Sequence, residues 1–326
     1  MKLHTSQAIV ELMQEVEHDL PWLLRAVQAA IELELSTIPP YLCALWSILD
    51  DTGLPFRHVR SIVREEMAHM GLMCNLLKGL GQTPKIISVA PHYPGPLPGG
   101  VRPEVTVYLS GLTKPFLCEV AMQVEKPEHP LALFRAREIF TSIGKFYDAI
   151  SAALSNLHPP LKAEGQLVAP QIRLTVLTSE SDALDAIRRI KLQGEGTETS
   201  PFVDGQLAHF YKFGEIFHEK RLIETTPGKF EFAGDPVPFP NRLPAARVPD
   251  GGWPKPLPDA VKAALTQFDS AYRNTLQLLE DAWSSGSQDT LGEAIMAMVT
   301  GLRGPARTLM QIPFKNGENY GPDFII

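Results

Sequence analysis

Acidic and imidazole side chains recur in this chain at spacings that fit a buried chemical centre. Glu66 and His69 are three residues apart, and residues at this spacing are neighbours on one face of a helix. Glu34 belongs to an earlier helical segment and falls inside its apolar stripe. A buried carboxylate is costly unless it is paired, protonated or bound to a metal. These residues therefore predict a metal-binding or acid–base centre between two helices.

The helix that carries Glu66 leaves a second interpretation open. Glu66 lies in the middle of the apolar face, whereas its neighbour Glu65 is predicted to point away. In place of a metal site, the inward groups could form a buried ion pair or a hydrogen-bonded cluster with Arg25 or Arg64. Periodicity alone does not choose between these interpretations.

Tyr41 would join the same centre if its helix is regular. It follows Glu34 by seven residues, or about two helical turns. Pro39 and Pro40 directly precede it, and we expect them to interrupt and kink the helix.

A helix predicted over residues 204–223 offers two candidates for the other half of the site. Glu215 and His218 have the Glu-x-x-His spacing, but Glu215 falls on the polar stripe and is predicted to be solvated. Gln206 and His209 share that spacing on the more apolar side. A neutral amide is a poor substitute for a bridging carboxylate, so the second half of a two-metal site is weakly supported.

Other polar residues have ordinary structural interpretations. On a helix predicted over residues 131–157, Glu138 and Lys145 both fall on the polar side. Glu125 is predicted to end a short helix, either as a surface cap or as a group that orders the site from outside. Three histidines in loops or Pro-rich segments are predicted to be exposed: His92, His129 and His158.

Periodicity predicts an all-α fold. The expected helices are near residues 5–17, 21–49, 56–80, 114–124, 131–157, 184–192, 204–223, 258–284 and 289–310. Residues 88–105 and 226–258 are rich in proline and predict long irregular connections, and no strand–turn–strand series is evident. We expect a helical bundle over residues 1–225, followed by a Pro-rich linker and a helical pair over residues 226–326.

Composition excludes several classes of function. The chain has 30 Lys and Arg against 37 Asp and Glu, which gives a formal charge of −7, and it has no basic stripe. Nucleic acid is therefore not an expected partner. The longest apolar stretch, residues 41–49, is too short to span a membrane. Cys43, Cys74 and Cys118 are interpreted as reduced core thiols of a cytoplasmic protein.

Several segments together resemble a known family. They are IELELSTIPPYLCALWSI (31–48), REEMAHMGLMCNLLKGLGQTP (64–84), TSIGKFYDAI (141–150), QGEGT (193–197), LAHFYKFGEI (207–216), FDSAYRNTLQLLEDAW (268–283) and YGPDF (320–324). The chain resembles the ferritin-like family of the iminophenyl-pyruvate dimer synthase domain, which occurs in a violacein-pathway protein and in stand-alone bacterial proteins. This resemblance implies a ferritin-like four-helix bundle with an elaborated C-terminal part.

The resemblance also implies roles for individual residues. Tyr41 would lie beside a site that holds iron or manganese, and the implied ligands are Glu34, Glu66, His69 and His209. Two positions depart from the family pattern, because Lys145 and Gln206 stand where carboxylates are expected. If both positions carry ligands in relatives, the site would hold one metal ion or none.

Three functions follow as hypotheses. The first is an enzyme of secondary metabolism that uses a metal to oxidise or couple a small aromatic or amino-acid-derived metabolite. The second is a metal-independent cyclase or coupling enzyme, in which buried Glu and His residues, and Lys145 if it enters the site, transfer protons. The third is a non-catalytic bundle that binds a small ligand. The sequence does not decide whether the chain forms a homodimer.

Overall fold

The computed structural model describes residues 9–127, 143–197 and 199–326. Its α-helices are α1 (Ile9–Gln14), α2 (Leu20–Ser47), α3 (Leu54–Gly79), α4 (Lys114–Phe116), α5 (Met122–Val124), α6 (Ile143–Leu157), α7 (Glu180–Glu195), α8 (His209–His218), α9 (Asp259–Ser285), α10 (Gln288–Met296) and α11 (Arg303–Leu309). Short strands pair as three antiparallel hairpins: β1 (Gly95–Pro96) with β2 (Thr106–Val107), β3 (Phe202–Val203) with β4 (Gln206–Leu207), and β5 (Lys220–Thr226) with β6 (Lys229–Pro236). The predicted all-α class is confirmed.

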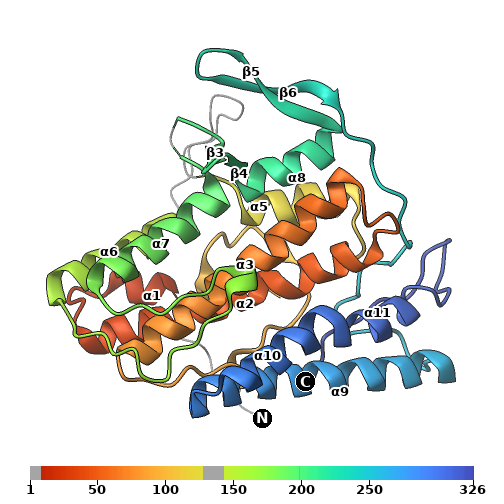
Figure 1. Cartoon of the computed structure of the whole chain (residues 1–326). Helices are drawn as coiled ribbons and strands as arrows, with labels where there is room; N and C mark the ends of the chain where they lie inside the picture. The colour runs from red at the N-terminus through yellow and green to blue at the C-terminus, as the bar shows by residue number, and fades with distance from the viewer. Residues whose placement is uncertain (1–8, 128–142, 198) are drawn as a thin grey trace.

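Helices α2 and α3 form the centre of the molecule. They pack along each other, α6 lies against α2, and both α7 and α8 lie against α3 (Figure 1). Every residue of α2 from Leu33 to Ser47 is buried, so this helix is surrounded by protein on all sides in its second half. A polar residue in that stretch has no access to solvent, which is why Glu34 must find its partners inside the bundle.

Helix α2 continues through Pro39 and Pro40, so the predicted interruption is wrong. Proline lacks an N–H, and Pro40 therefore leaves the carbonyl of Ser36 without its helical donor. The hydroxyl of Tyr93 donates to this carbonyl at 2.7 Å. The lost backbone bond is thus replaced by a side chain from the Pro-rich connection, and the helix keeps Tyr41 on the face expected from periodicity.

The predicted helix over residues 204–223 is wrong at both ends. Asp204 and Gly205 have positive φ of 49° and 74° and form the two-residue turn between β3 and β4, a turn for which Asp-Gly is favoured. Only His209–His218 is helical, and the chain then enters the β5–β6 hairpin. Strand pairing was missed there because the hairpin is a surface ribbon, with few buried residues to give a period-two pattern.

The C-terminal helices form a layer against the side of α2 and α3 opposite the β5–β6 hairpin (Figure 1). Helix α9 packs on α10 and α11, and α11 contacts α2. The second predicted helix of this pair is divided, because a π-helical turn, Ala297–Gly301, separates α10 from α11. The division of the chain at residues 225 and 226 remains a prediction.

The predictions for the cysteines, for the loop histidines and for membrane-spanning segments can also be compared with the structure. Cys43 and Cys74 are buried, but Cys118 is exposed, so its placement in the core is wrong. His92 and His158 are exposed as predicted, and His129 lies outside the described residues. Within the described ranges, no helix has both the length and the apolarity that a bilayer crossing requires.

The stability of the C-terminal layer is expected to depend on a proton shared by Asp269 and Asp323. Burial and the neighbouring Asp323 raise the pKa of Asp269 to about 7, whereas an unfolded Asp titrates near 3.9. The folded state therefore binds more protons between about pH 4 and pH 7, and its stability falls as pH rises through that window. Asp269→Asn keeps a hydrogen-bond donor without this titration. We expect its melting temperature to exceed that of the wild type at pH 8 by about 2 °C and to match it near pH 4.

The control for this measurement is Asp281→Asn, which changes an exposed carboxylate on the same helix. It should keep the wild-type difference in melting temperature between pH 4 and pH 8. An Asp269→Asn protein with that same pH difference would contradict the shared proton.

Candidate metal centre

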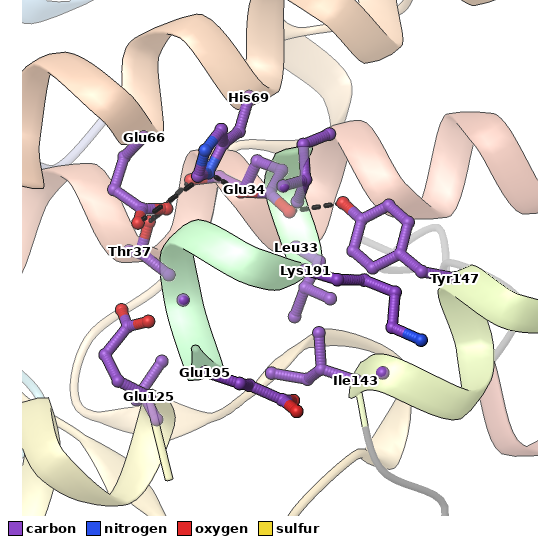
Figure 2. Close-up of a pocket in the computed structure, with 14 residues that line it drawn as sticks. Leu33, Glu34, Thr37, Glu66, His69, Glu125, Ile143, Tyr147, Lys191 and Glu195 are labelled. Carbon is purple, nitrogen blue, oxygen red and sulfur yellow. Dashed lines mark hydrogen bonds and ion pairs between the residues drawn. The ribbon is translucent and has the colours of Figure 1, made fainter. Parts of the chain in front are cut away.

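Five acidic and imidazole side chains converge between the helices. Glu34 comes from the middle of α2, Glu66 and His69 come from α3, Glu125 caps the C-terminal end of α5, and His209 is the first residue of α8. All five are buried, with His209 fully excluded from solvent. Figure 2 shows Glu66, His69 and Glu34 together, with Glu125 facing them from the opposite wall.

These side chains form two groups that share one residue. In the first group, single donor atoms of Glu34, Glu66 and His69 all lie within 4.8 Å of one another. In the second group, Glu66, Glu125 and His209 meet the same limit. Glu66 therefore lies between the two groups.

A hydroxyl group holds one oxygen of each carboxylate. Tyr147 of α6 donates to Glu34 Oε1, Tyr41 donates to Glu125 Oε1 at 2.6 Å, and Thr37 donates to Glu66 Oε2 at 2.8 Å. The second oxygen of each carboxylate is then turned toward an imidazole. All three anchors are uncharged, so they fix the carboxylates without neutralising them.

The second oxygens meet the two imidazoles at Nδ1. Glu34 Oε2 lies 3.5 Å from Nδ1 of His69, and Glu125 Oε2 lies 3.4 Å from Nδ1 of His209. Glu66 Oε1 lies 3.9 Å from Nδ1 of His69 and 2.8 Å from Nδ1 of His209. Three carboxylate oxygens and two imidazole nitrogens thus face a common space.

The outer nitrogens of both imidazoles have separate partners. Nε2 of His69 lies 2.7 Å from Oε1 of Gln193, and Nε2 of His209 lies 2.7 Å from Oε2 of Glu65. An amide oxygen and an ionised carboxylate only accept hydrogen bonds, so each Nε2 is the donor. This arrangement leaves Nδ1 of each ring as the nitrogen that offers a lone pair to a metal once it is deprotonated.

Electrostatics in the cluster depend on how close its acidic groups lie. Burial and the neighbouring Glu125 raise the pKa of Glu66 to about 7, although both imidazoles oppose this. Burial also disfavours the charged form of Glu125, but the His209 cation outweighs it and lowers the pKa of Glu125. For His209, burial opposes protonation, yet Glu125, Glu65 and Glu66 raise its pKa well above the usual value. Protons therefore balance the negative charge, and a divalent cation could replace them.

Two further observations support the fit of these residues to a metal ion. Nδ1 of His209 is buried and has no hydrogen bond of acceptable geometry to any described residue, as expected of an atom placed for coordination. Four residues of the cluster, Glu34, Glu66, His69 and Glu125, line a cavity of about 50 Å³. This volume has room for ions and a few waters, since one water needs about 10–15 Å³. Gly194 belongs to the wall of this cavity. Any other residue there would place its Cβ 3.3 Å from Glu125 Oε2 and crowd this oxygen.

The structure corrects the predictions for Glu125 and for the helices expected over residues 131–157 and 204–223. Glu125 is not a surface cap, because it is buried and joins the cluster. Lys145 is exposed, as periodicity predicted and contrary to the family resemblance, and Tyr147 of the same helix reaches Glu34 instead. Gln206 is exposed in β4 and does not join the cluster. Glu138 lies outside the described residues.

One glutamate was placed wrongly by helical periodicity. Glu215 is fully buried rather than solvated, and it contacts Nε2 of His58 at 2.7 Å. Glu65 points away from the cluster as predicted, but it is only partly exposed and accepts from His209 and Lys212. Arg25 pairs with Glu15, and Arg64 donates to the carbonyl of Gln171, so neither arginine supplies the ion pair considered as an alternative to a metal.

Comparison with known proteins defines the class. Residues 27–218 match the sequence profile of the ferritin-like family, which is more than half of the chain. The chain belongs to the ferritin-like family, which includes many oxidoreductases. The structure is similar to the crystal structure of a ferritin-like protein from Caulobacter vibrioides, with a TM-score of 0.68 and 23% identity, covering 94% of this chain and 98% of that one. No curated protein sequence matches the chain significantly.

Removal of either outer contact should weaken metal binding. Glu65→Ala and Gln193→Ala leave the inward-facing donor atoms in place but release Nε2 of one imidazole. Loss of such outer hydrogen bonds costs about 10–100-fold in metal affinity, which competition with a chromophoric chelator would measure. Ser61→Ala, one turn before Glu65 on α3, is the control and should bind metal as the wild type does. Unchanged affinity in both test variants would show that the outer contacts do not orient the imidazoles.

Proposed function

We propose that the protein is a metal-dependent oxidoreductase whose centre holds two ions of iron or manganese. The observation that carries this proposal is the pair of three-residue groups that share Glu66. Carboxylates and imidazoles are the ligands used by di-iron and di-manganese centres inside helical bundles. Family membership supports the proposal, because metal centres of this kind are built on ferritin-like bundles.

Each residue has a role in this proposal. His69 and Glu34 would hold one ion, His209 and Glu125 would hold the other, and Glu66 would serve both. Iron or manganese, when bound, supplies one-electron redox chemistry and Lewis acidity.

The hydroxyl groups have a separate role. Tyr41 and Tyr147 hold the outer oxygens of Glu125 and Glu34, so that the inner oxygens keep their direction. Thr37 does the same for Glu66. The five side chains of the cluster are at most 7% exposed, and low exposure to water strengthens the electrostatic interactions among them.

The substrate we propose is a small aromatic or amino-acid-derived metabolite that is oxidised or oxidatively coupled. This assignment follows the resemblance to the iminophenyl-pyruvate dimer synthase domain, and a role in secondary metabolism is proposed on the same basis. The cavity of about 50 Å³ at the cluster is too small for an aromatic metabolite, so such a substrate needs additional space next to the centre.

One observation favours a second candidate function, a metal-independent acid–base enzyme. Burial and Glu125 raise the pKa of Glu66 to about 7, and a group that titrates near neutral pH is suited to proton transfer. A protein freed of metal by chelation that still converts a substrate would favour this candidate.

Metal analysis of the protein purified without chelator tests the main proposal. We expect about two iron or manganese ions per chain, together with oxygen consumption by the iron-loaded protein. Glu66→Gln removes the ligand common to both groups, so it should lose most of the bound metal and the oxygen consumption. In metal-depleted wild type, re-addition of metal at about 100 times Kd should stabilise the fold by about 2.7 kcal/mol, and Glu66→Gln should lack this effect.

Glu32→Gln and Glu34→Gln form a matched pair for the same assay. Both changes are on α2, but only Glu34 belongs to the cluster. Metal content should fall in Glu34→Gln and stay at the wild-type level in Glu32→Gln. A wild-type protein without tightly bound metal would contradict the proposal, and a single ion per chain would contradict the shared role of Glu66.

A further inference from the structure

A second pocket, of about 400 Å³, lies on the other side of the two imidazoles. This volume is within the range of small-molecule binding sites and much larger than the cavity at the cluster. Its walls come from α3, α7, α8, the loop before α7 and the β3–β4 hairpin. Figure 1 shows this hairpin next to the start of α8. Glu65 and Gln193, which hold the outer nitrogens of the imidazoles, belong to its wall.

The charge of this pocket is opposite to that of the chain. Its lining has four cationic residues, Arg64, Arg173, Arg189 and Lys212, against two anionic ones, Glu65 and Asp204. The excess of two positive charges occurs in a chain of net charge −7. Lys212 is already paired with Glu65 at 2.9 Å, so the arginines provide the uncompensated charge.

Within the described residues, no carboxylate lies at ion-pair distance from any of the three arginines. Arg189 donates from one terminal nitrogen to the carbonyl of Arg173 at 3.1 Å, and its buried Nε has no hydrogen-bond partner there. Burial and the nearby Arg173 lower the pKa of Arg189. Crowded cations of this kind are stabilised by an anion.

The loop that presents Arg173 is held in place. Asn75 of α3 donates to the carbonyls of Leu167 and Thr175 at 2.7 and 2.8 Å and accepts from the N–H of Leu167 at 2.9 Å. Arg173 itself has a left-handed backbone with φ of 60°, which is costly for a residue with a long side chain. The loop geometry is thus determined by buried contacts rather than left to solvent.

We propose that this pocket binds a small organic acid, with its carboxylate held by Arg173 and Arg189. A planar guanidinium matches the two oxygens of a carboxylate. Ile172, Val203 and Leu207 supply apolar surface for the remainder of the ligand. As an assignment of substrate class, the inference rests on the proposed oxidoreductase function, and the binding itself does not.

The position of the pocket connects the ligand to the metal centre. Glu65 and Gln193 belong to the wall of the pocket and contact the outer nitrogens of the two imidazoles of the cluster. A bound anion also competes with Glu65 for Lys212. With about 400 Å³ against about 50 Å³, the pocket has the volume for a small metabolite that the cavity at the cluster lacks.

Calorimetric titration of the full-length protein as purified tests the inference, with benzoate, its neutral amide benzamide, and inorganic phosphate as probes. Benzoate should bind at least about tenfold more tightly than benzamide. Arg173→Gln and Arg189→Gln should each weaken benzoate binding by at least about tenfold, a difference of about 1.4 kcal/mol. Arg188→Gln is the matched control, because Arg188 is the exposed neighbour of Arg189 on α7 and does not line the pocket.

Several outcomes would overturn the inference. They are equal binding of benzoate and benzamide, no benzoate binding at millimolar concentration, or wild-type affinity in the folded Arg189→Gln protein, as judged by its melting curve. Tighter arginine-dependent binding of phosphate than of benzoate would replace the organic acid by a phosphate ester.

Metal content separates this inference from the proposed function. The arginine variants should retain the metal of the wild type, since none of the arginines belongs to the cluster. Benzoate binding by a protein without metal would contradict the oxidoreductase and leave the pocket standing. Metal-loaded protein that binds no organic anion would contradict the organic-acid pocket and leave the oxidoreductase proposal standing.

Discussion

The hydrogen bonds from three hydroxyl groups to three buried carboxylates are the constraint on which the centre depends. Glu34, Glu66 and Glu125 lie in an apolar bundle, where an isolated carboxylate would be strongly destabilising. Neutralisation by arginine or lysine would solve this problem but would leave no charge for a cation. Hydroxyl donors satisfy one oxygen of each carboxylate and leave the other one available. The bundle thus tolerates negative charge at a point where only protons or metal ions can balance it.

Several features of the fold serve this arrangement. Because α2 continues through Pro39 and Pro40, Thr37 and Tyr41 stay on the same side of the helix as Glu34. The hydroxyl of Tyr93 supports this continuity, since it donates to the carbonyl that Pro40 leaves without a helical donor. The third hydroxyl comes from Tyr147 on α6, which packs on α2. Every anchor therefore belongs either to α2 or to a helix in direct contact with it.

Sequence patterns predicted the α2–α3 half of the site well because both helices are long. Over many turns, an apolar stripe defines a face, and Glu34, Glu66 and His69 could be assigned to it from a rotation of about 100° per residue. Glu125 follows a helical segment of only a few turns that contains a π-helical turn, Leu117–Ala121, so no stripe existed to place it. The Val-Glu-Lys-Pro sequence signals only that a helix ends there.

Interactions between helices explain the remaining errors. Glu215 has a charged side chain, and the pattern of a single helix assigns such a residue to solvent. In the fold, Glu215 meets His58 of α3, and Lys212 meets Glu65 of the same helix, so both are buried with partners more than a hundred residues away. His209 was placed at the site by a spacing within a longer helix that does not exist. It reaches the site because α8 begins there, directly after the β3–β4 hairpin.

Glu65 and Glu66 show how one helix serves two environments. Consecutive residues on a helix differ by about 100° in direction, so Glu66 faces the cluster and Glu65 faces the cationic pocket. Burial and Glu125 raise the pKa of Glu66 to about 7. Burial opposes ionisation of Glu65 as well, but His209 and Lys212 outweigh it and lower its pKa to about 2. His209 contacts both carboxylates, through Nδ1 to Glu66 and Nε2 to Glu65. A change of charge on either side of α3 therefore alters the surroundings of the same imidazole, and this ring is one direct connection between the cluster and the pocket.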